Sequence, residues 1–399
     1  MKILVLNAGS SSLKFSVIDA VGEAVLGSGV VDWGLSPVQL RWQAAGRTET
    51  KSMPGPLTSH RDAVESVLSL LHEEGPALAD SGAIVAVGHR VVHGGDVYTT
   101  SVRIDGAVKR AIAALAEVAP LHNPANLAGI EAAEAALPGV PMVAVFDTAF
   151  HAGMPAAARV YPLPYRWYQE WGIRRYGFHG LSHAYCAARA TAMLAAAGRP
   201  AGRLVVAHLG NGCSLAAIRD GVSVDTTMGF SPLEGLVMGT RSGSVDPGVL
   251  LHLLRRKGMT PEQLDHALNY ESGLLGLCGL ADMRAVRAAA QAGQPLARLA
   301  LDVYVHRLRQ GISAMTAALS GLDALIFTAG VGENSAEVRA ETCAGLAFLG
   351  LHLDAAANLA CRPDADIATA DSPARILVIA TREDMTVARE TCRVLGLRP

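Results

Sequence analysis

Two glycine-rich hairpins that share one pattern are the feature of this 399-residue chain that most constrains its fold. The first, Val5–Lys14, is a strand, a turn of glycine and small hydroxyl residues, and a second strand that ends in Asp19. The second, Val206–Leu215, repeats this pattern with one extra residue expected in its turn, and its second strand continues to Asp220. A repeated unit suggests a duplicated domain. Two unrelated hairpins would also explain the pattern, because glycine-rich turns are common.

Apolar runs of strand length alternate with longer alanine-rich segments along the chain. The predicted strands are Ile3–Leu6, Ile84–Val87, Pro141–Phe146, Leu204–Leu209, Ala324–Phe327 and Arg375–Ala380. The predicted helices are Ala107–Ala119, Ala125–Ala136, His183–Ala197 and Leu296–Leu319. This order is typical of an α/β protein whose helices cover both faces of a sheet. The polar segment Ser36–Thr58, which is punctuated by Pro and Gly, is expected to form hairpins or loops at a sheet edge.

Composition narrows the class of protein. Half of the residues (50%) are hydrophobic, 18% are charged and the net charge is −2, which describes a globular chain. Few aromatic residues and no basic excess argue against nucleic-acid binding. The six cysteines form no C-x-x-C pair, and no apolar run is long enough for a signal peptide or a membrane span. We therefore expect a cytoplasmic enzyme without nucleic-acid or membrane partners.

The glycine-rich turns suit phosphate groups. In the first hairpin, consecutive N–H groups can point inward, Lys14 can neutralise a phosphate oxygen and Asn7 can reach a metal-bound water. The turns His208–Gly212 and Ala329–Asn334 offer two further sites, the latter between a strand and a helix expected from Ser335. Walker A, protein-kinase and complete Rossmann motifs are absent. Ser11–Lys14 matches the S-x-x-K of penicillin-binding serine enzymes, but their S-D-N and K-T-G motifs are missing.

Charged groups cluster where strands end, which is where open α/β sheets bind ligands. His89 and His93 are spaced as a zinc pair would be on a helix, but their segment is extended and no zinc site is expected. Glu383 is interpreted either as a charge at a helix N-terminus or as a magnesium ligand. The clusters are Gly88–Gly95, Asp147, Arg174–Gly180, Gly239–Gly243 and Glu383.

Together these motifs closely resemble the acetate kinase family over essentially the whole chain and in the family's order. The matching stretches are Asn7–Lys14, Gly88–Gly95, Pro120–Pro124, Phe146–His151, Arg174–Gly180, His208–Gly212, Met228–Arg241, Asp282–Arg284, Gly330–Ser335 and Glu383. The resemblance implies two duplicated actin-like (ribonuclease H-like) α/β domains with ATP in an interdomain cleft, and a homodimer. The first domain is expected to comprise residues 1–150 and about 384–399, and the second residues 151–383.

The resemblance also implies roles for individual residues. Asp147, His179 and Arg241 are expected to be catalytic, Asp147 as the family's acid and the other two as transition-state stabilisers. Asn7 and Glu383 are expected to hold Mg²⁺ or Mn²⁺. The expected substrate-binding residues are Arg90 for the carboxylate, with Val92, Leu121, His122, Phe178 and Pro232. The expected ATP contacts are Lys14, His208, Leu209, Gly210, Asn211, Gly212, Asp282, Met283, Arg284, Gly330, Val331, Gly332, Glu333 and Asn334.

The implied activity is reversible transfer of the γ-phosphoryl group of ATP to acetate, which yields acetyl phosphate and ADP by direct in-line displacement. A propionate or butyrate kinase on the same scaffold is the first alternative, and an actin-like or chaperone-like ATPase switch is a remote one. Leu181, Ser244 and Arg382 stand where the family usually has Thr, Asp and Asn, and Ser231 replaces Thr. Arg382 adjoins Glu383, so this substitution bears most directly on metal affinity and nucleotide preference.

Overall fold

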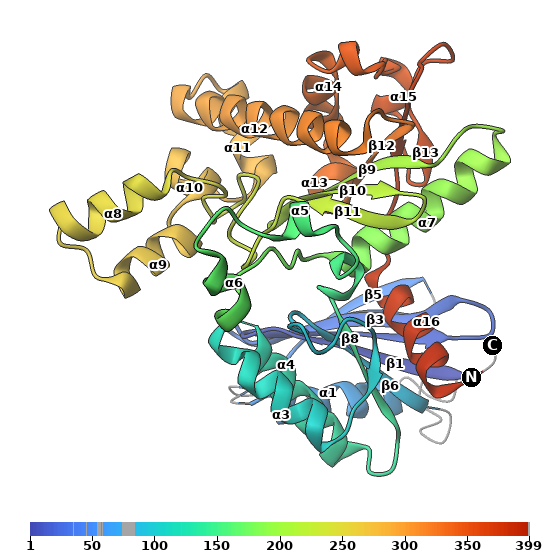
Figure 1. Cartoon of the computed structure of the whole chain (residues 1–399). Coiled ribbons are helices and arrows are strands. Elements are labelled where there is room, and N and C mark those ends of the chain that lie inside the picture. The colour runs from blue at the N-terminus through green and yellow to red at the C-terminus, as the bar shows by residue number, and fades with distance from the viewer. Residues whose placement is uncertain are drawn as a thin grey trace. The chain divides into compact units, whose positions relative to one another are not determined.

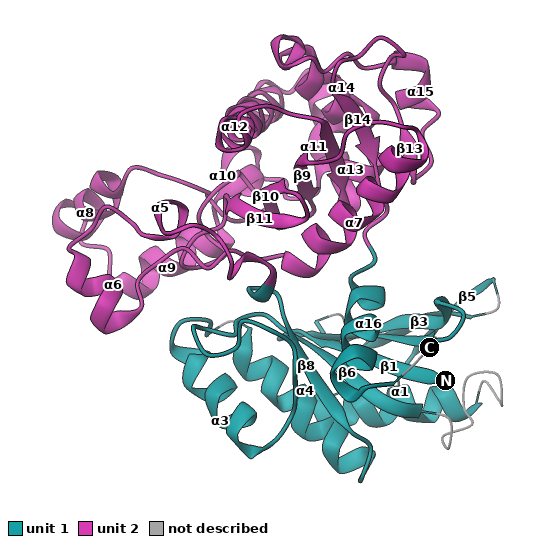
Figure 2. Cartoon of the chain, turned by 45° about the vertical axis from the view of Figure 1, so that its right-hand side comes forward, with its two compact units in different colours: residues 1–149, 382–399 teal, residues 150–381 magenta. Residues whose placement is uncertain are grey.

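The computed structural model describes residues 1–34, 36–44, 46–53, 57, 59–73, 84–120 and 122–397. The chain divides into two compact units, residues 1–149 with 382–399 and residues 150–381, which we call unit 1 and unit 2 (Figure 2). None of the helices within the described ranges is both long and apolar enough to cross a membrane.

Unit 1 is built on one mixed sheet with the strand order β5-β4-β3-β2-β1-β6-β8-β7. Its centre pairs β1 antiparallel with β2 and parallel with β6, and β6 runs parallel with β8. Helices α1 and α4 pack on one face and α16 on the other (Figure 1). The elements are β1 (Lys2–Ala8), β2 (Ser12–Asp19), β3 (Ala24–Asp32), β4 (Gln39–Ala44), β5 (Arg47–Ser52), α1 (His60–Glu73), β6 (Ile84–Val91), β7 (Val102–Arg103), α3 (Gly106–Ala114), η2 (Leu115–Glu117), α4 (Asn123–Ala136), β8 (Met142–Phe146) and α16 (Glu383–Leu395).

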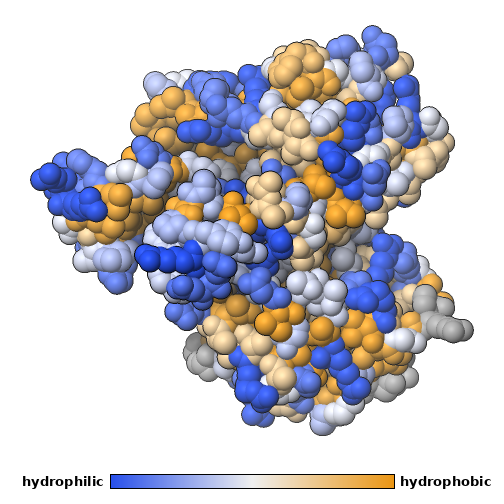
Figure 3. Space-filling model, in the orientation of Figure 1, coloured by the Kyte–Doolittle hydropathy of each residue, from blue (hydrophilic) through white to orange (hydrophobic). Residues whose placement is uncertain are grey.

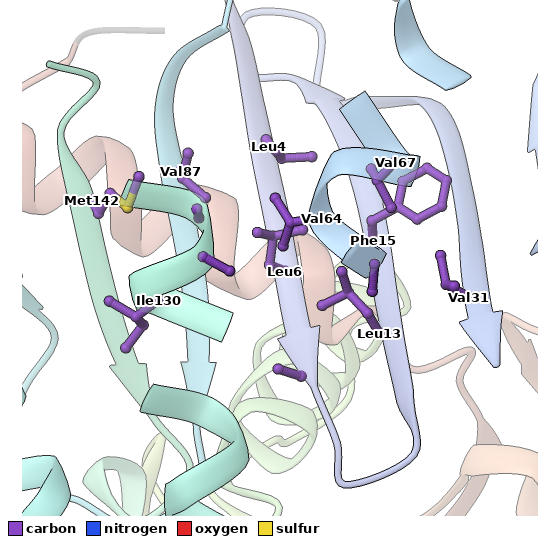
Figure 4. Close-up of a cluster of buried hydrophobic side chains, with 14 of the residues drawn as sticks. Leu4, Leu6, Leu13, Phe15, Val31, Val64, Val67, Val87, Ile130 and Met142 are labelled. Atoms are coloured by element: carbon purple, nitrogen blue, oxygen red, sulfur yellow. The ribbon is translucent and has the colours of Figure 1, made fainter. Parts of the chain in front are cut away.

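Alternating apolar residues fill the space between this sheet and its helices. Leu4 and Leu6 of β1 and Leu13 and Phe15 of β2 point to the same side and meet the valines of α1 (Figure 4). The other sheet face admits α16 closely, because a side chain at Gly88 would lie 2.6 Å from Val387 Cγ1. The predicted edge hairpin is confirmed, since β4 and β5 pair antiparallel and β5 is the outermost strand.

Unit 2 repeats the central arrangement in a sheet with the order β11-β10-β9-β12-β14-β13. Its apolar core includes residues of α7, β9, β12 and β14, and α12 packs against β9 and β10. The strands are β9 (Arg203–Leu209), β10 (Cys213–Arg219), β11 (Val222–Thr226), β12 (Ala324–Thr328), β13 (Ala365–Asp366) and β14 (Arg375–Val378). The helices are η3 (Ala149–His151, at the boundary), α5 (Ala156–Arg159), α6 (Tyr165–Trp171), α7 (Gly180–Ala196), α8 (Pro247–Arg256), α9 (Pro261–Tyr270), α10 (Gly273–Cys278), α11 (Met283–Gln291), α12 (Pro295–Leu319), α13 (Ala329–Asn334), α14 (Ala336–Ala344), η4 (Ala347–Leu349) and α15 (Ala355–Leu359).

The two sheets therefore share a core topology of an antiparallel three-strand meander followed by two parallel strands. In unit 1 this is β3-β2-β1-β6-β8, and in unit 2 it is β11-β10-β9-β12-β14. The shared order supports the predicted duplication of an α/β domain. The extra residue expected in the second hairpin is absent, because the turns Gly9–Ser11 and Gly210–Gly212 between the paired strands are of equal length. The expected ATP cleft between the domains stays a prediction.

Candidate active site

A guanidinium held by two carboxylates lies at the carboxyl end of the parallel strands in unit 1. Arg90, near the end of β6, donates from Nε (3.1 Å) and Nη2 (2.6 Å) to Oδ2 of Asp147, which directly follows β8. Its Nη1 lies 3.0 Å from Oε2 of Glu383, the first residue of α16. Burial opposes the charge on Arg90, but Asp147 and Glu383 outweigh it and raise the pKa of the guanidinium above its usual range. Arg90 is therefore a fixed cation at a ligand-binding edge of the sheet.

Buried amides and histidines fix the loop that follows β6. Asn126 of α4 accepts from Val92 N (3.0 Å) and donates to the carbonyl of Ala8 (2.8 Å), so it ties this loop to β1. Asn123 accepts from His93 N and donates back to the His93 carbonyl. Burial lowers the pKa of His89 to about 3, so this side chain is neutral at pH 7. The described residues contain no group of three or more His, Cys, Asp and Glu side chains that could hold a metal.

The β1–β2 hairpin places Asn7 directly opposite Lys14. Gly9 N donates to Ser12 O (2.7 Å) and closes the turn, and a ring nitrogen of His60 lies 2.9 Å from the Gly9 carbonyl oxygen. Lys14 is exposed. The hairpin therefore presents an amide and an ammonium group from neighbouring strands, as phosphate or metal binding would require.

Besides Arg90, three predicted substrate-binding residues fall in unit 1. Val92 lies two residues after Arg90, but β6 ends at Val91, so strand alternation does not orient the Val92 side chain. Its position is fixed instead by the hydrogen bond to Asn126. His122 is the N-cap residue of α4, without a side-chain capping bond. Leu121 lies outside the described residues.

In unit 2, His179 and Arg241 converge on the glycine-rich turn between β9 and β10. A Cβ atom placed on Gly212 would lie 3.2 Å from Arg241 Nη2, 3.3 Å from His179 Cε1 and 3.4 Å from His179 Nε2. Glycine at 212 thus lets an imidazole edge and a guanidinium face the same small space. His179 is the N-cap residue of α7 and has a left-handed backbone with φ of 56°, a conformation that costs free energy in a non-glycine residue and is often found at functional sites.

A network of side chains holds the loop that carries Arg241. The Arg241 Nη1 donates to the carbonyl of Pro232 (2.8 Å). Glu234, on the same loop, pairs with Arg175 (2.9 Å) and accepts from the hydroxyl of Tyr161. Pro232, a predicted substrate-binding residue, is thereby positioned through its backbone.

Phe178, which was also predicted to bind substrate, is almost fully buried with 1% exposure. Its carbonyl lies 3.1 Å from Nε2 of His151. Burial lowers the pKa of His151 to about 4, an effect that the hydrogen bond to Phe178 partly offsets and Arg175 reinforces. This structure therefore places Phe178 in the packed interior of unit 2.

A pocket of about 360 Å³ in unit 2 brings together most of the predicted ATP contacts. Its lining includes Gly210, Asn211, Asp282, Met283, Arg284, Gly330, Val331 and Asn334 from the prediction. Four further lining residues, Leu274, Ala281, Arg287 and Tyr304, lie in no motif and come from separate helices and loops. The lining also includes Gly239 and Ser335, which lie in motif segments but were not predicted to contact ATP. Apolar walls with a few polar groups are usual for a nucleotide base and ribose.

Five other predicted ATP contacts of unit 2 do not line this pocket, namely His208, Leu209, Gly212, Gly332 and Glu333. Residues 329–334 were predicted as a turn, but they form the short helix α13. Glu333 stabilises its start by accepting from Ala329 N (2.9 Å) and also accepts from Thr381 N (3.0 Å). Burial raises the pKa of Glu333, which fits a structural acceptor within unit 2.

The residues that depart from the expected pattern have identifiable places. Leu181 is buried in the first turn of α7. Ser244 bonds to Gly235 through both its hydroxyl (3.0 Å) and its backbone N–H (2.9 Å), which closes the loop before α8. Arg382 is exposed and caps α16 beside Glu383. Of these positions, Arg382 is the one that adds a charge next to the Arg90 cluster.

Comparisons with known proteins show the family to which the chain belongs. The model of the acetokinase family matches residues 2–389. An acetate kinase from Gloeobacter violaceus is 53% identical over 98% of both chains. A propionate kinase structure from Francisella tularensis superposes with a TM-score of 0.92 at 39% identity over 98% of this chain and 99% of that one. An acetate kinase structure from Porphyromonas gingivalis gives 0.89 at 39% identity over 99% of both. These matches confirm the actin-like fold of the two units, and the chain belongs to the acetokinase family.

Proposed function

We propose that this protein is an acetate kinase. An oxygen of the acetate carboxylate attacks the γ-phosphorus of ATP, the bond from that phosphorus to the β–γ bridging oxygen breaks, and acetyl phosphate and ADP form. The observation that carries the proposal is Arg90, a cation fixed at the sheet edge by Asp147 and Glu383. Arginine can bind both oxygens of a carboxylate and stays charged when buried. The acetate kinases among its relatives support the same assignment.

The remaining groups match the needs of phosphoryl transfer, in which charge spreads over the equatorial oxygens of the moving group. Arg241 and His179 face the space at Gly212, where they would stabilise that charge, and the unit 2 pocket would hold the nucleoside. Acetate is ionised at pH 7, as a glutamate side chain with a pKa of about 4.3 is. No proton has to be removed from it, so we assign Asp147 the task of orienting Arg90.

The carboxylates near Arg90 are also suited to a magnesium site. Asp147 and Glu383 contact the same guanidinium, so their oxygens converge, and Asn7 would add an amide oxygen. Magnesium is commonly held by one or two carboxylates together with waters and substrate phosphates. When bound, the ion neutralises phosphate charge.

Asp147→Asn should lower kcat by about 10²-fold, because the fixed orientation of the Arg90 guanidinium weakens when its charged partner is lost. The defect should change with Mg²⁺ concentration or on substitution of Mn²⁺. Raising the pH should not relieve it, because the attacking group carries no proton. Steady-state kinetics from pH 6 to 9 at several metal concentrations would measure this.

Asp384→Asn is the matched control for Asp147→Asn. Asp384 is also a carboxylate of unit 1 and accepts from Ser16 Oγ (2.9 Å), but it does not pair with Arg90. It should keep near wild-type kinetics. If the loss of kcat in Asp147→Asn does not depend on Mg²⁺ concentration and instead follows the protonation of the acid substrate, Asp147 acts as a general base.

The size of the acid substrate distinguishes an acetate kinase from a propionate or butyrate kinase. A propionate kinase is among the similar structures, so propionate is the alternative acid to test first. If Val92 limits the space beside the carboxylate, Val92→Ala should raise kcat/KM for propionate relative to acetate severalfold, mainly through KM. One methylene in such a pocket is worth about 1–3 kcal/mol. The neighbouring Val91→Ala is the control, since Val91 is fully buried in the core of unit 1. An unchanged propionate-to-acetate ratio in Val92→Ala would remove Val92 from the substrate pocket.

The proposed activity is tested by incubating the purified protein with MgATP, hydroxylamine and one acid at a time, and by measuring the hydroxamate formed. We expect acetate to give the highest kcat/KM, with propionate about 10–200-fold lower. A higher value for propionate or butyrate would identify the alternative kinase. ATP hydrolysis that is equal with and without any acid would identify an ATPase switch.

We also propose a homodimer, which helix α8 supports. Five of its ten residues are apolar, namely Val249, Leu250, Leu251, Leu253 and Leu254, yet none of its residues is buried. Figure 3 shows orange, hydrophobic surface beside the hydrophilic tip of the α8–α9 region. An exposed apolar surface of this kind is typical of an association face. We expect the second copy of this chain to cover it.

Leu251→Glu should convert the dimer to a monomer, because the new charge would be buried without a partner. Sedimentation equilibrium at micromolar protein concentration would measure this. Val97→Glu adds the same charge at an exposed valine of unit 1 and should leave the dimer intact. A wild type that sediments as a monomer would refute the proposed homodimer.

A further inference from the structure

A buried serine links His179 to a second histidine that has no role in the proposed reaction. Ser214 of β10 lies 2.9 Å from Nδ1 of His179 and 2.8 Å from Nε2 of His183, both measured from its hydroxyl oxygen. Ser214 and His183 are fully buried. His179 and His183 lie one turn apart at the start of α7, so both rings reach the same hydroxyl.

The proton on His183 can be assigned from its surroundings. Burial, with smaller effects of His151 and His208, lowers the pKa of His183 well below its usual value, so the ring is neutral and carries one proton. Its Nδ1 is buried and has no hydrogen-bond partner among the described residues. An orphaned buried N–H is rarer in proteins than an orphaned acceptor. The proton therefore lies on Nε2, which donates to Ser214.

The direction of the next hydrogen bond follows from this assignment. A serine hydroxyl has one proton to donate and two lone pairs that accept. The Ser214 oxygen accepts from His183 Nε2, and its own proton is then available for Nδ1 of His179. If His179 were protonated at Nδ1, both lone pairs of the Ser214 oxygen would accept and the buried Ser214 proton would have no acceptor among the described residues.

The positive charge of Arg241 beside His179 also favours a neutral His179 ring. Arg241 Nη2 and the Nε2 edge of His179 both lie within 3.4 Å of one position at Gly212. The imidazole rings of His179 and His208 stack with centroids 4.2 Å apart, and the ring of His151 lies 5.6 Å from that of His183. A positive His179 would face the Arg241 cation across that position.

We propose that Ser214 and His183 are positioning residues that hold His179 as a neutral imidazole with its proton on Nε2. His179 then offers a directed N–H, while Arg241 supplies the positive charge. This refines the expected role of His179 as a transition-state stabiliser, and its value for catalysis rests on the proposed phosphoryl transfer. The tautomer itself does not depend on that proposal.

Nitrogen-15 NMR of histidine-labelled, full-length protein tests the tautomer without substrates. Two-bond ¹H–¹⁵N spectra distinguish the Nε2–H form, the Nδ1–H form and the imidazolium. The signals of His179 and His183 are assigned by their loss in His179→Gln and His183→Gln. At pH 7 we expect both rings to show the neutral Nε2–H pattern. An Nδ1–H or imidazolium pattern for either ring would overturn the proposed relay.

Substitutions at Ser214 test the relay itself against a matched control. Ser214→Ala should release His179, so that its spectrum shows mixed tautomers and a protonated fraction that grows below pH 7, and kcat should fall about tenfold. Ser214→Thr keeps the hydroxyl and should keep both the spectrum and most of the activity. Ser223→Ala is the control, because Ser223 is equally buried and lies 2.8 Å from Nδ1 of a different histidine, His151.

The outcomes separate the relay from a structural role and from the proposed function. If Ser214→Ala leaves the His179 signals unchanged, or if Ser223→Ala lowers kcat equally, the relay is refuted. If the wild type shows the predicted tautomer but does not phosphorylate acetate, the proposed function fails while the relay stands.

Discussion

Arg241→Lys should lower kcat by about 10²–10³-fold, as the loss of one fixed donor at developing charge does in other enzymes. The Arg241 guanidinium donates through Nη1 to the Pro232 carbonyl at 2.8 Å while Nη2 faces Gly212. A lysine ammonium keeps the charge but cannot occupy both positions. The KM for ATP should stay within severalfold, because the lining of the unit 2 pocket does not include Arg241. Initial rates over a grid of ATP and acetate concentrations measure both constants.

Arg219→Lys provides the matched control for Arg241→Lys. Arg219 is an exposed residue of unit 2 whose Nη2 donates to the Ala318 carbonyl at 3.0 Å. The same change there should leave kcat unaltered. Near-full turnover in Arg241→Lys would show that its fork geometry has no part in stabilising the transferred group.

Arg90→Gln should lower kcat/KM for acetate by about 10³-fold, because truncating one member of a desolvated charge pair costs about 2–5 kcal/mol. It should also reduce the free energy of unfolding by about 3 kcal/mol, since Asp147 would remain buried without its cation. Kinetics at saturating ATP and urea denaturation measure the two effects separately.

Two further variants distinguish binding from folding at Arg90. Arg203 pairs with a similarly buried carboxylate, Asp323, at 2.6 Å, but lies at the start of β9 and outside the candidate site. Arg203→Gln should lower stability and leave kcat/KM unchanged. The double variant Arg90→Gln/Asp147→Asn also removes the carboxylate charge that Arg90 neutralises, so it should recover stability but not activity. Recovered activity in the double variant would contradict a direct role of Arg90 in binding the carboxylate.

The sequence predicts those parts of the fold that local patterns encode. The apolar runs at Ile3–Leu6 and Leu204–Leu209 lie within β1 and β9, and the repeated glycine turns reveal the duplication that the two strand orders share. Alanine-rich periodicity likewise places α12 almost residue for residue. These signals succeed because each depends on neighbours along the chain.

Features that depend on contacts between residues far apart in the chain are not predicted from the sequence. α13 forms although two glycines lie within Ala329–Asn334, because Glu333 accepts from the first N–H of the helix. Val92 lies one residue beyond its strand, at a point fixed by Asn126 from another helix. The bonds of Ser214 to two histidines bring β10 against α7. No spacing along the chain encodes these contacts.

The sequence likewise predicts individual residues of the candidate site but not the contacts between them. Motifs identify Arg90, Asp147 and Glu383 individually, and the resemblance to a family gives them roles. Their ion pairs become visible only when β6, β8 and α16 are folded together. The resemblance also directs attention to Phe178, yet burial at 1% exposure shows that packing alone would require an apolar residue there. Roles assigned by motif therefore need the substitutions described above.

Phosphorus-31 NMR of the complete reaction tests the central claim most directly. With wild-type protein, MgATP and acetate, the γ-phosphate signal of ATP should be replaced by the signal of acetyl phosphate, and ADP should form in equal amount. Without acetate, the signals of ATP should persist. Adding acetyl phosphate and MgADP should regenerate ATP. Formation of AMP and pyrophosphate, or of ADP and inorganic phosphate at a rate independent of acetate, would contradict transfer of the γ-phosphoryl group to a carboxylate.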